Sequence, residues 1–129
     1  MRMRTMGDRA NFGFTEGNGK PTLYLYGHSA GYEMLSNLAH ALEAARPRWS
    51  DPAYGTRITI SHMIGEDWNS EYGWGLSIDY LCDNEHSIPV VDWDKQTVSL
   101  YANINSLTSK FTMSLDAFVK KFAKTPSYA

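Results

Sequence analysis

Cysteine is almost absent from this chain of 129 residues, and Cys82 is the single thiol. One cysteine cannot form a disulfide within the chain, which fits a protein of the reducing cytoplasm. Long apolar runs are also missing, since no stretch approaches the roughly 18 residues that span a bilayer. The basic start over residues 1–6 is not followed by an apolar region, so it is not expected to be a signal peptide. A membrane partner is therefore not expected.

Positive charge is missing from the middle of the chain. Residues 58–94 contain eight acidic residues and no Lys or Arg, whereas the whole chain has a net charge of −2. An acidic segment of this kind repels phosphate backbones, so nucleic acid is not an expected partner. The segment forms either a solvated face or a surface for a cation or a basic partner.

Aromatic residues, by contrast, are abundant and make up 13% of the chain. The hydrophobic content of 43% and the charged content of 20% are those of an ordinary globular domain. The length suits one domain with a modest core over residues 1–129, with residues 1–7 expected to fray and residues 124–129 expected to form a tail. So many large rings must either fill that core or lie at a binding surface.

The first half of the chain predicts a hairpin followed by a helix. Residues 9–14 and 21–26 are strand-like and are separated by a Gly-Asn-Gly turn, which predicts an opening β-hairpin. In the second strand the leucines face one side and the tyrosines face the other. Residues 31–45 carry apolar side chains at helical spacing and predict a helix that ends before Pro47.

Residues 50–64 fit either a helix or a strand. A helix is favoured because Ser50 or Asp51 can cap it, with Pro52 in its first turn. The alternation of Ile58 and Ile60 is the argument for a strand.

The second half predicts a sheet closed by a helix. After a loop over residues 65–75, three runs rich in β-formers cover residues 74–82, 87–93 and 97–102, and the turn residues between them indicate an antiparallel meander. Residues 114–123 predict a helix capped by Ser114. The order β-β-α-α-β-β-β-α predicts a single α+β domain, with a mostly antiparallel sheet and helices packed on one face.

Residues 27–31 read Gly-His-Ser-Ala-Gly and match the hydrolase motif G-x-S-x-G. In hydrolases this motif raises the serine above a central parallel strand, where backbone N–H groups bind the oxyanion. Here the preceding strand alternates instead of being apolar on both faces, and at most one hairpin comes before it. The motif is therefore interpreted as a turn between strand and helix, with Ser29 as a helix cap.

A small serine hydrolase stays open as an alternative. Ser29 would be the nucleophile, His86 the base, and Asp83 or Asp79 the acid, which is the order along the chain in these hydrolases. His62 is another candidate base. Nothing in the sequence brings any of these residues to Ser29.

A metal-dependent phosphoesterase is a further alternative. Asp83, Glu85 and His86 lie within four residues and could together bind a divalent cation. No second ligand cluster with a recognisable spacing follows, so a hairpin turn is the favoured interpretation. Neither a metal nor another cofactor is expected.

Aromatic residues in the loops form the favoured binding surface. Large exposed rings are unfavourable in water unless something covers them. The candidate residues lie in or beside loops rich in Gly, Pro and acid: Trp49, Tyr54, Trp68, Tyr72 and Trp74. We therefore expect a binding protein, with no enzymatic activity, that contacts another protein or a small ligand and forms a homo-oligomer.

Four blocks of the chain carry a resemblance to known sequences. They are Gly-Asp-Arg-Ala-Asn-Phe-Gly-Phe over residues 7–14, Leu-Tyr-Gly-His over 25–28, Trp-Ser-Asp-Pro-Ala-Tyr-Gly-Thr-Arg-Ile over 49–58, and Asp-Asn-Glu-His over 83–86. In this order they resemble a family of small uncharacterised proteins encoded by phages of actinobacteria, over roughly residues 7–100. The resemblance brings no catalytic residues. It implies a phage accessory protein in the bacterial host cytoplasm, where such proteins block a host enzyme or sequester a defence signal.

Overall fold

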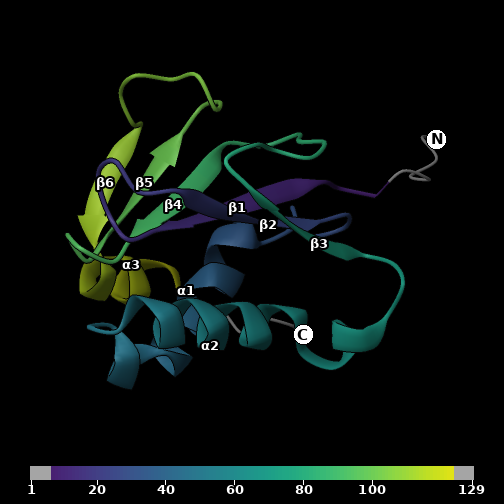
Figure 1. The fold of residues 1–129 in the computed structure, drawn as a ribbon, viewed down its shortest axis with the longest axis horizontal. Helices are drawn as coiled ribbons and strands as arrows, with labels where there is room; N and C mark the ends of the chain where they lie inside the picture. The colour runs from purple at the N-terminus through teal and green to yellow at the C-terminus, as the bar shows by residue number, and fades with distance from the viewer. Residues whose placement is uncertain (1–6, 124–129) are drawn as a thin grey trace.

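The computed structural model describes residues 7–123, which form a six-stranded sheet with helices packed below it (Figure 1). The predicted α+β class is confirmed. Of the segments expected to fray or to form a tail, only Gly7 lies within the described residues. The elements are β1 (Ala10–Thr15), β2 (Thr22–Gly27), α1 (Met34–Ala44), η1 (Arg46–Arg48), α2 (Pro52–Ile64), η2 (Gly65–Asn69), β3 (Trp74–Ile78), β4 (Ile88–Asp92), β5 (Thr97–Tyr101), β6 (Phe111–Ser114) and α3 (Leu115–Phe122).

The strands follow the spatial order β3-β2-β1-β4-β5-β6. All neighbouring pairs are antiparallel except β1 and β4, which are parallel. The sequence predicted that the runs over residues 74–82, 87–93 and 97–102 form one meander, and this is wrong for the first run. The strand β3 pairs with β2, and the chain then crosses the sheet to place β4 on the other side of β1. Contacts from β1 to residues 83–85 hold this crossing, so the acidic turn there does not close a hairpin.

The strand β6 did not emerge from the sequence. It has only 4 residues, and two of them are polar, so its alternation is too short to distinguish from a loop. In the structure β6 pairs with β5 and continues directly into α3, so β4, β5 and β6 form the meander.

Capping side chains set the start of two helices. The favoured helix over residues 50–64 is confirmed as α2, where Asp51 accepts a hydrogen bond from the backbone N–H of Tyr54 at 3.4 Å. Ser114 caps α3 as predicted, by accepting from the N–H of Ala117 at 3.0 Å. These bonds satisfy backbone donors that have no partner within the first helical turn.

The core lies between the sheet and the helices. Its fully buried members come from most elements: Phe12, Leu25, Leu38, Leu42, Val91, Val98 and Phe118. The alternation in β2 is observed as predicted, because Leu25 enters this core whereas Tyr24 lies on the opposite face of the sheet. That opposite face is crossed only in part by the loop between β5 and β6, which rises away from the helices (Figure 1).

Candidate functional site

The turn over residues 27–31 does not cap a helix. The helix α1 begins only at Met34, and its N-cap position is Glu33, which has a φ of 53° and makes no side-chain capping bond. The prediction that Ser29 caps this helix is therefore wrong. Backbone bonds hold the turn instead, because the N–H of Gly31 donates to Asp8 O at 2.8 Å and delays the start of the helix.

The two glycines of the motif allow close packing. Neither Gly27 nor Gly31 has a positive φ, so left-handed backbone geometry is not their role. A Cβ on Gly27 would lie 2.8 Å from the indole of Trp74, and a Cβ on Gly31 would lie 2.6 Å from the carboxyl carbon of Asp8 and collide with His86. The turn thus leaves space for side chains from three other segments.

Two of these residues, Asp8 and His86, belong to a polar group that we call the Asp8–His86 cluster. Its members are Asp8, Arg9, Asp83, Glu85 and His86. The Nε2 of His86 lies 2.5 Å from Asp8 Oδ1. The guanidinium of Arg9 contacts Asp83 at 2.9 Å and Glu85 at 3.2 Å. Residues that are 76 positions apart in the chain, such as Arg9 and Glu85, therefore share one charged surface.

Asn11 holds the cluster together and was missed by the sequence analysis. This fully buried side chain donates from Nδ2 to Asp83 O at 3.0 Å and to Asn84 Oδ1 at 3.1 Å. A buried amide within a strand requires hydrogen-bond partners, and here the partners fix the 83–86 segment on β1. The available signal was a polar residue between two apolar neighbours in a predicted strand. Three of the four blocks behind the phage resemblance, at residues 7–14, 25–28 and 83–86, meet at this point.

The hydrolase residues are brought only partly together. His86 reaches the 27–31 turn, but its acid is Asp8 in place of Asp83 or Asp79. Asp79 is instead bonded to the N–H of Thr22 at the far end of β3. Within residues 7–123, no hydrogen bond joins the exposed Ser29 to a histidine. The arrangement offers an acid–base pair with no nucleophile bonded to it.

Among the described residues, neither His62 nor His28 forms a hydrogen bond with Ser29, although His28 is its neighbour in sequence. His62 is an exposed residue of α2. The Nδ1 of His28 lies 3.1 Å from the hydroxyl of Tyr26, whose pKa is raised mainly by desolvation. Because that hydroxyl stays protonated at neutral pH, it can donate to His28.

The five aromatic candidates divide between core and surface. Trp49 packs against the core and donates from Nε1 to Leu42 O at 2.9 Å, and Trp74 also packs against the core. Tyr54 is exposed beneath the guanidinium of Arg48. Trp68 and Tyr72 are exposed by 47% and 79%, so they retain the character expected of a contact surface.

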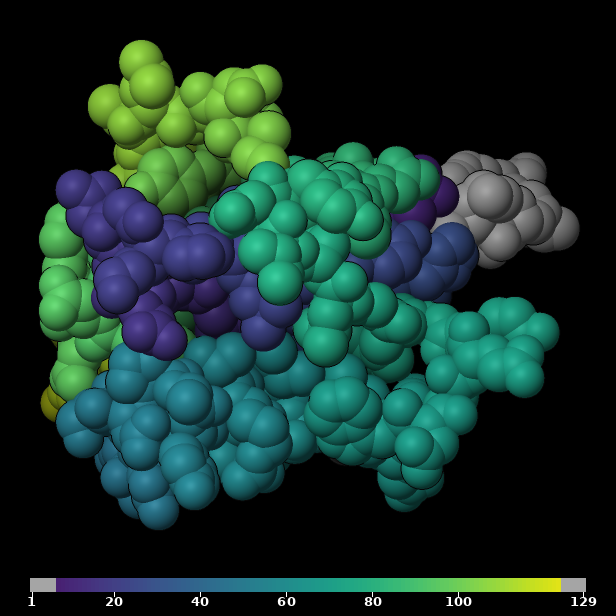
Figure 2. All heavy atoms as spheres, in the orientation of Figure 1, coloured from purple at the N-terminus to yellow at the C-terminus, as the bar shows by residue number. Residues whose placement is uncertain are grey.

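Trp68 belongs to an apolar groove, which we call the β3 groove. It encloses about 620 Å³ between α2 and the β2–β3 end of the sheet. Leu23, Leu76 and Ile78 supply its upper wall, and Leu76 and Ile78 are exposed by 52% and 62%. In Figure 2 the atoms of α2 lie in the lower part of the view and those of β3 lie above them. The other lining residues include Phe14, Pro21, Ala53, Thr56, Arg57, Ile60 and Trp93.

The groove runs along the outer edge of β3, with which no other strand pairs among residues 7–123. In an antiparallel pair, successive residues direct their N–H and C=O groups alternately toward and away from the neighbouring strand. The bonds His28 N–H to Gly73 O and Asp79 N–H to Thr22 O show that the odd-numbered residues of this segment face β2. The backbone groups of Trp74, Leu76 and Ile78 therefore point to the free edge.

Acidic side chains surround this edge. Glu66, Asp67 and Glu71 are exposed near Trp68, and Asp79 is exposed at the opposite end of β3. Strand edges that must stay free usually carry a charge or a proline within the strand. The five residues of β3 carry neither. Lys20 and Arg57 line the groove itself, so these acids set a charge preference at the two ends of β3 without blocking the edge.

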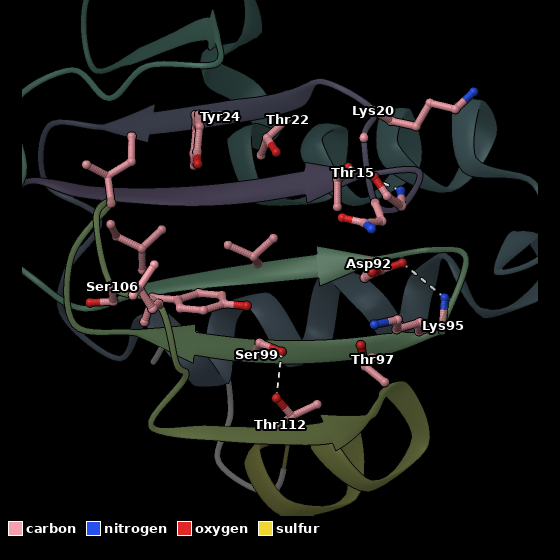
Figure 3. Close-up of a pocket in the computed structure, with 18 of the residues that line it drawn as sticks. Thr15, Lys20, Thr22, Tyr24, Asp92, Lys95, Thr97, Ser99, Ser106 and Thr112 are labelled. Atoms are coloured by element: carbon pink, nitrogen blue, oxygen red, sulfur yellow. Dashed lines mark hydrogen bonds between the residues drawn. The ribbon is translucent and has the colours of Figure 1, made fainter.

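A second hollow, of about 570 Å³, lies on the face of the sheet away from the helices (Figure 3). Its labelled lining is largely hydroxyl-bearing and comes from several strands. Two of these groups, the hydroxyls of Ser99 and Thr112, bond each other at 2.7 Å. Tyr24 is only 8% exposed there, and burial is the main cause of its raised pKa. This hollow is the solvated face of an antiparallel sheet, whereas the β3 groove is apolar and uncovered.

Among the described residues, no helix has the length and hydrophobicity needed to cross a bilayer. Comparison with known proteins finds no matching family model, no matching curated protein and no matching solved structure.

Proposed function

We propose that this protein binds a partner protein through the β3 groove. The observation that carries the proposal is the exposure of Leu76 and Ile78 on an edge strand whose outward N–H and C=O groups are unpaired. An extended segment of the partner would bond to these groups as a seventh strand, in the mode called β-augmentation. Trp68, the exposed member of the predicted aromatic surface that lines the groove, would contact that segment.

The groove defines the side chains that the partner segment requires. The side chains of Leu76 and Ile78 point to the helix-covered side of the sheet, where their partners in β2 are Leu25 and Leu23. A strand added at this edge places every second side chain on the same side. The partner segment is therefore apolar at alternating positions, and those side chains pack over α2 and Trp68.

The charges near β3 favour a different protein over a second copy of this chain as the occupant of the β3 groove. An antiparallel β3–β3 pair centred on Leu76 would place Asp79 of one chain opposite Gly73 of the other, two residues from Glu71. Such proximity of like charges opposes association. A partner segment flanked by Lys or Arg would instead meet the exposed acids at both ends of the groove. This favours a basic-flanked partner, while the expected homo-oligomer stays a prediction.

The resemblance to phage proteins suggests the biological setting of this binding. In that setting the partner is a protein of the bacterial host, and occupation of one of its extended segments blocks its function. Antagonism of a defence protein is one such role. This part of the proposal depends on the resemblance alone, whereas the binding mode depends on the groove.

A synthetic peptide can test the binding mode directly. The probe has alternating valine and threonine flanked by two lysines at each end, and its binding is followed through the fluorescence of a dye on the peptide. Leu76→Lys places a charge in the groove, and we expect it to weaken binding at least about tenfold. Leu107→Lys is the matched control, because Leu107 is 97% exposed in the loop between β5 and β6, away from the groove.

Two further peptides separate strand addition from nonspecific attraction. One has the same composition with the apolar residues grouped together, and the other carries N-methyl groups that remove the edge-facing N–H donors. Both are expected to bind at least about tenfold more weakly than the probe. Equal binding of all three peptides, or equal loss in Leu107→Lys, would contradict the proposal. If the chain alone forms a stable dimer and Leu76→Lys dissociates it, the groove binds a second copy of the chain and no different partner is needed.

A further inference from the structure

The geometry points to a second site, independent of the β3 groove: we propose that Asp8, Glu85 and His86 bind a divalent transition-metal ion. One ligand atom from each residue can be chosen so that all three lie within 4.8 Å of one another. Two carboxylates and an imidazole form a mixed oxygen and nitrogen donor set, which suits Zn²⁺ or Mn²⁺. Three protein ligands leave coordination positions open for water or for an oxygen atom of a bound molecule.

The backbone fixes the positions of these ligands. Asp8 is held against the 27–31 turn, because its N–H donates to His28 O at 2.8 Å and its carbonyl accepts from Gly31. Glu85 is held beside the start of β1, because its N–H donates at 3.0 Å to the carbonyl of Arg9, the residue before that strand. Ligands held in this way lose little conformational entropy when an ion binds.

Neighbouring side chains orient the same group. Arg9 donates its backbone N–H to Glu85 Oε1 at 2.9 Å and its guanidinium to Oε2 at 3.2 Å. The side chain of Asn84 donates to His86 O at 2.7 Å. Each oxygen of Glu85 retains a lone pair for a cation, because a carboxylate oxygen has two. Arg9 and Asn84 thus resemble the outer groups that orient ligands in metal sites.

The charges of the cluster favour an added cation. Within the described residues, the salt bridges of its three carboxylates go to Arg9 and His86. When His86 is neutral, as a metal ligand must be, one guanidinium faces three negative charges. A divalent ion between Asp8 and Glu85 balances the two remaining charges.

The site is also accessible and has space for an ion. The side chains of His86, Asp8 and Glu85 are exposed by 34%, 29% and 40%, so an ion can enter from solvent. Ligand atoms about 2.1 Å from a tetrahedral zinc ion lie about 3.4 Å from one another. An ion bound between the three residues would replace the hydrogen bond between His86 Nε2 and Asp8 Oδ1, and the side chains would rotate to that spacing. Gly31 keeps the space open, since its Cβ would collide with both His86 and Asp8.

This set differs from the one considered in the sequence, where no metal was expected. The alternative group there was Asp83, Glu85 and His86, which are close in sequence. The structure places Asp83 outside the group, with its carboxylate on Arg9 and its side chain 64% exposed. Asp8 takes its place, because β1 and the 83–86 segment lie side by side only in the folded chain.

Calorimetric titration of the full, chelator-treated chain with ZnCl₂ and with MnCl₂ tests the site. We expect one ion per chain for at least one metal, and a melting temperature that rises with metal concentration. His86→Gln and Asp8→Asn should each weaken binding at least about tenfold. Gly31→Ala should also weaken binding, although it removes no ligand.

Two controls identify binding elsewhere on the surface. Asp83→Asn removes a carboxylate next to the site, and His62→Gln removes an exposed histidine far from it in the chain; both are expected to retain stoichiometric binding. The proposal is overturned if wild-type protein binds neither metal stoichiometrically. It is also overturned if His62→Gln or Asp83→Asn loses as much affinity as His86→Gln. Circular dichroism verifies that each variant is folded. If a variant does not fold, the titration of the wild-type protein still decides the proposal.

Discussion

The strands β3 and β6 form the two edges of one sheet, but the burial of their apolar side chains differs. At β6 the chain passes directly into α3, and Phe111 stacks on Phe122 with ring centroids 6.2 Å apart. At β3 the chain leaves Leu76 and Ile78 exposed beside an apolar groove. The apolar side chains of β6 pack against the core and α3, whereas those of Leu76 and Ile78 leave apolar area that a partner can cover.

The comparison also separates stability from binding. The side chains on the β6 side reach the common core, so changes there should unfold the protein. The exposed side chains of β3, Leu76 and Ile78, contribute little to the core. Changes there should therefore alter binding and leave the fold intact. Four substitutions test this difference, in order of decreasing expected effect on stability.

Phe118→Ala should have the largest effect. The ring is fully buried in α3 and lies 4.8 Å from that of Phe122. Truncation leaves a cavity and should lower the free energy of unfolding by about 3–5 kcal/mol. Urea denaturation measures this loss. A change below about 1 kcal/mol would show that α3 is not part of the cooperative core.

Ser114→Ala should have an intermediate effect. It removes the side chain that accepts a hydrogen bond from the N–H of Ala117 at the start of α3. The expected loss is about 1 kcal/mol, measured in the same urea experiment. Ser114→Asp should restore most of it, because aspartate caps equally well and its charge suits the helix N-terminus. Failure of this rescue would indicate that Ser114 acts through β6 pairing.

Leu76→Ala should have a small effect on stability. The side chain is 52% exposed, so truncation removes little buried area and should cost less than about 1 kcal/mol. The same substitution should weaken peptide binding by at least about threefold, because the lost area lies in the groove. Leu25→Ala, the neighbouring position of β2 in the buried core, is the contrasting control. Equal destabilisation by both substitutions would remove the distinction between the two edges.

Asp116→Asn should have the smallest effect, and that effect should depend on pH. Hydrogen bonds from Lys120 and then Arg46 lower the pKa of Asp116 from 3.8. Because its pKa is lower in the folded state, the Asp116 carboxylate stabilises the fold at pH values above its pKa in the unfolded chain. This contribution is lost as the pH falls through the folded-state pKa. The difference in melting temperature between wild type and variant should therefore be present near pH 7 and vanish at strongly acidic pH. Because these groups are exposed, added salt should reduce it.

Local chemistry explains why most of the fold could be predicted. Asp51 ahead of Pro52, Ser114 ahead of an apolar stripe and the alternation in β2 each fix an element through interactions a few residues apart. The start of α1 was misplaced, because the bond from Gly31 to Asp8 is made by a residue 23 positions earlier in the sequence. Strand β6 was missed because its four residues are too few to show a recognisable alternation.

The candidate sites were less predictable than the elements. The sequence indicated Trp68 as a surface residue, but the groove needs Leu23 from β2, Ile60 from α2 and Ile78 from β3 together. It indicated Glu85 and His86 as possible ligands, but it paired them with Asp83, their neighbour in sequence. Distance along the chain is a poor guide to ligands because strand pairing brings remote residues within a few ångströms.

The sequence by itself determined the α+β class, the positions of most helices and strands, the acidic middle of the chain and the side of β2 that is buried. These properties depend on periodicity, capping and charge, which act over a few residues. Only the tertiary structure decided that β3 lies at an edge and that Asp8 meets His86. Both follow from the order of strands in the sheet, and that order is set by the packing of the whole core.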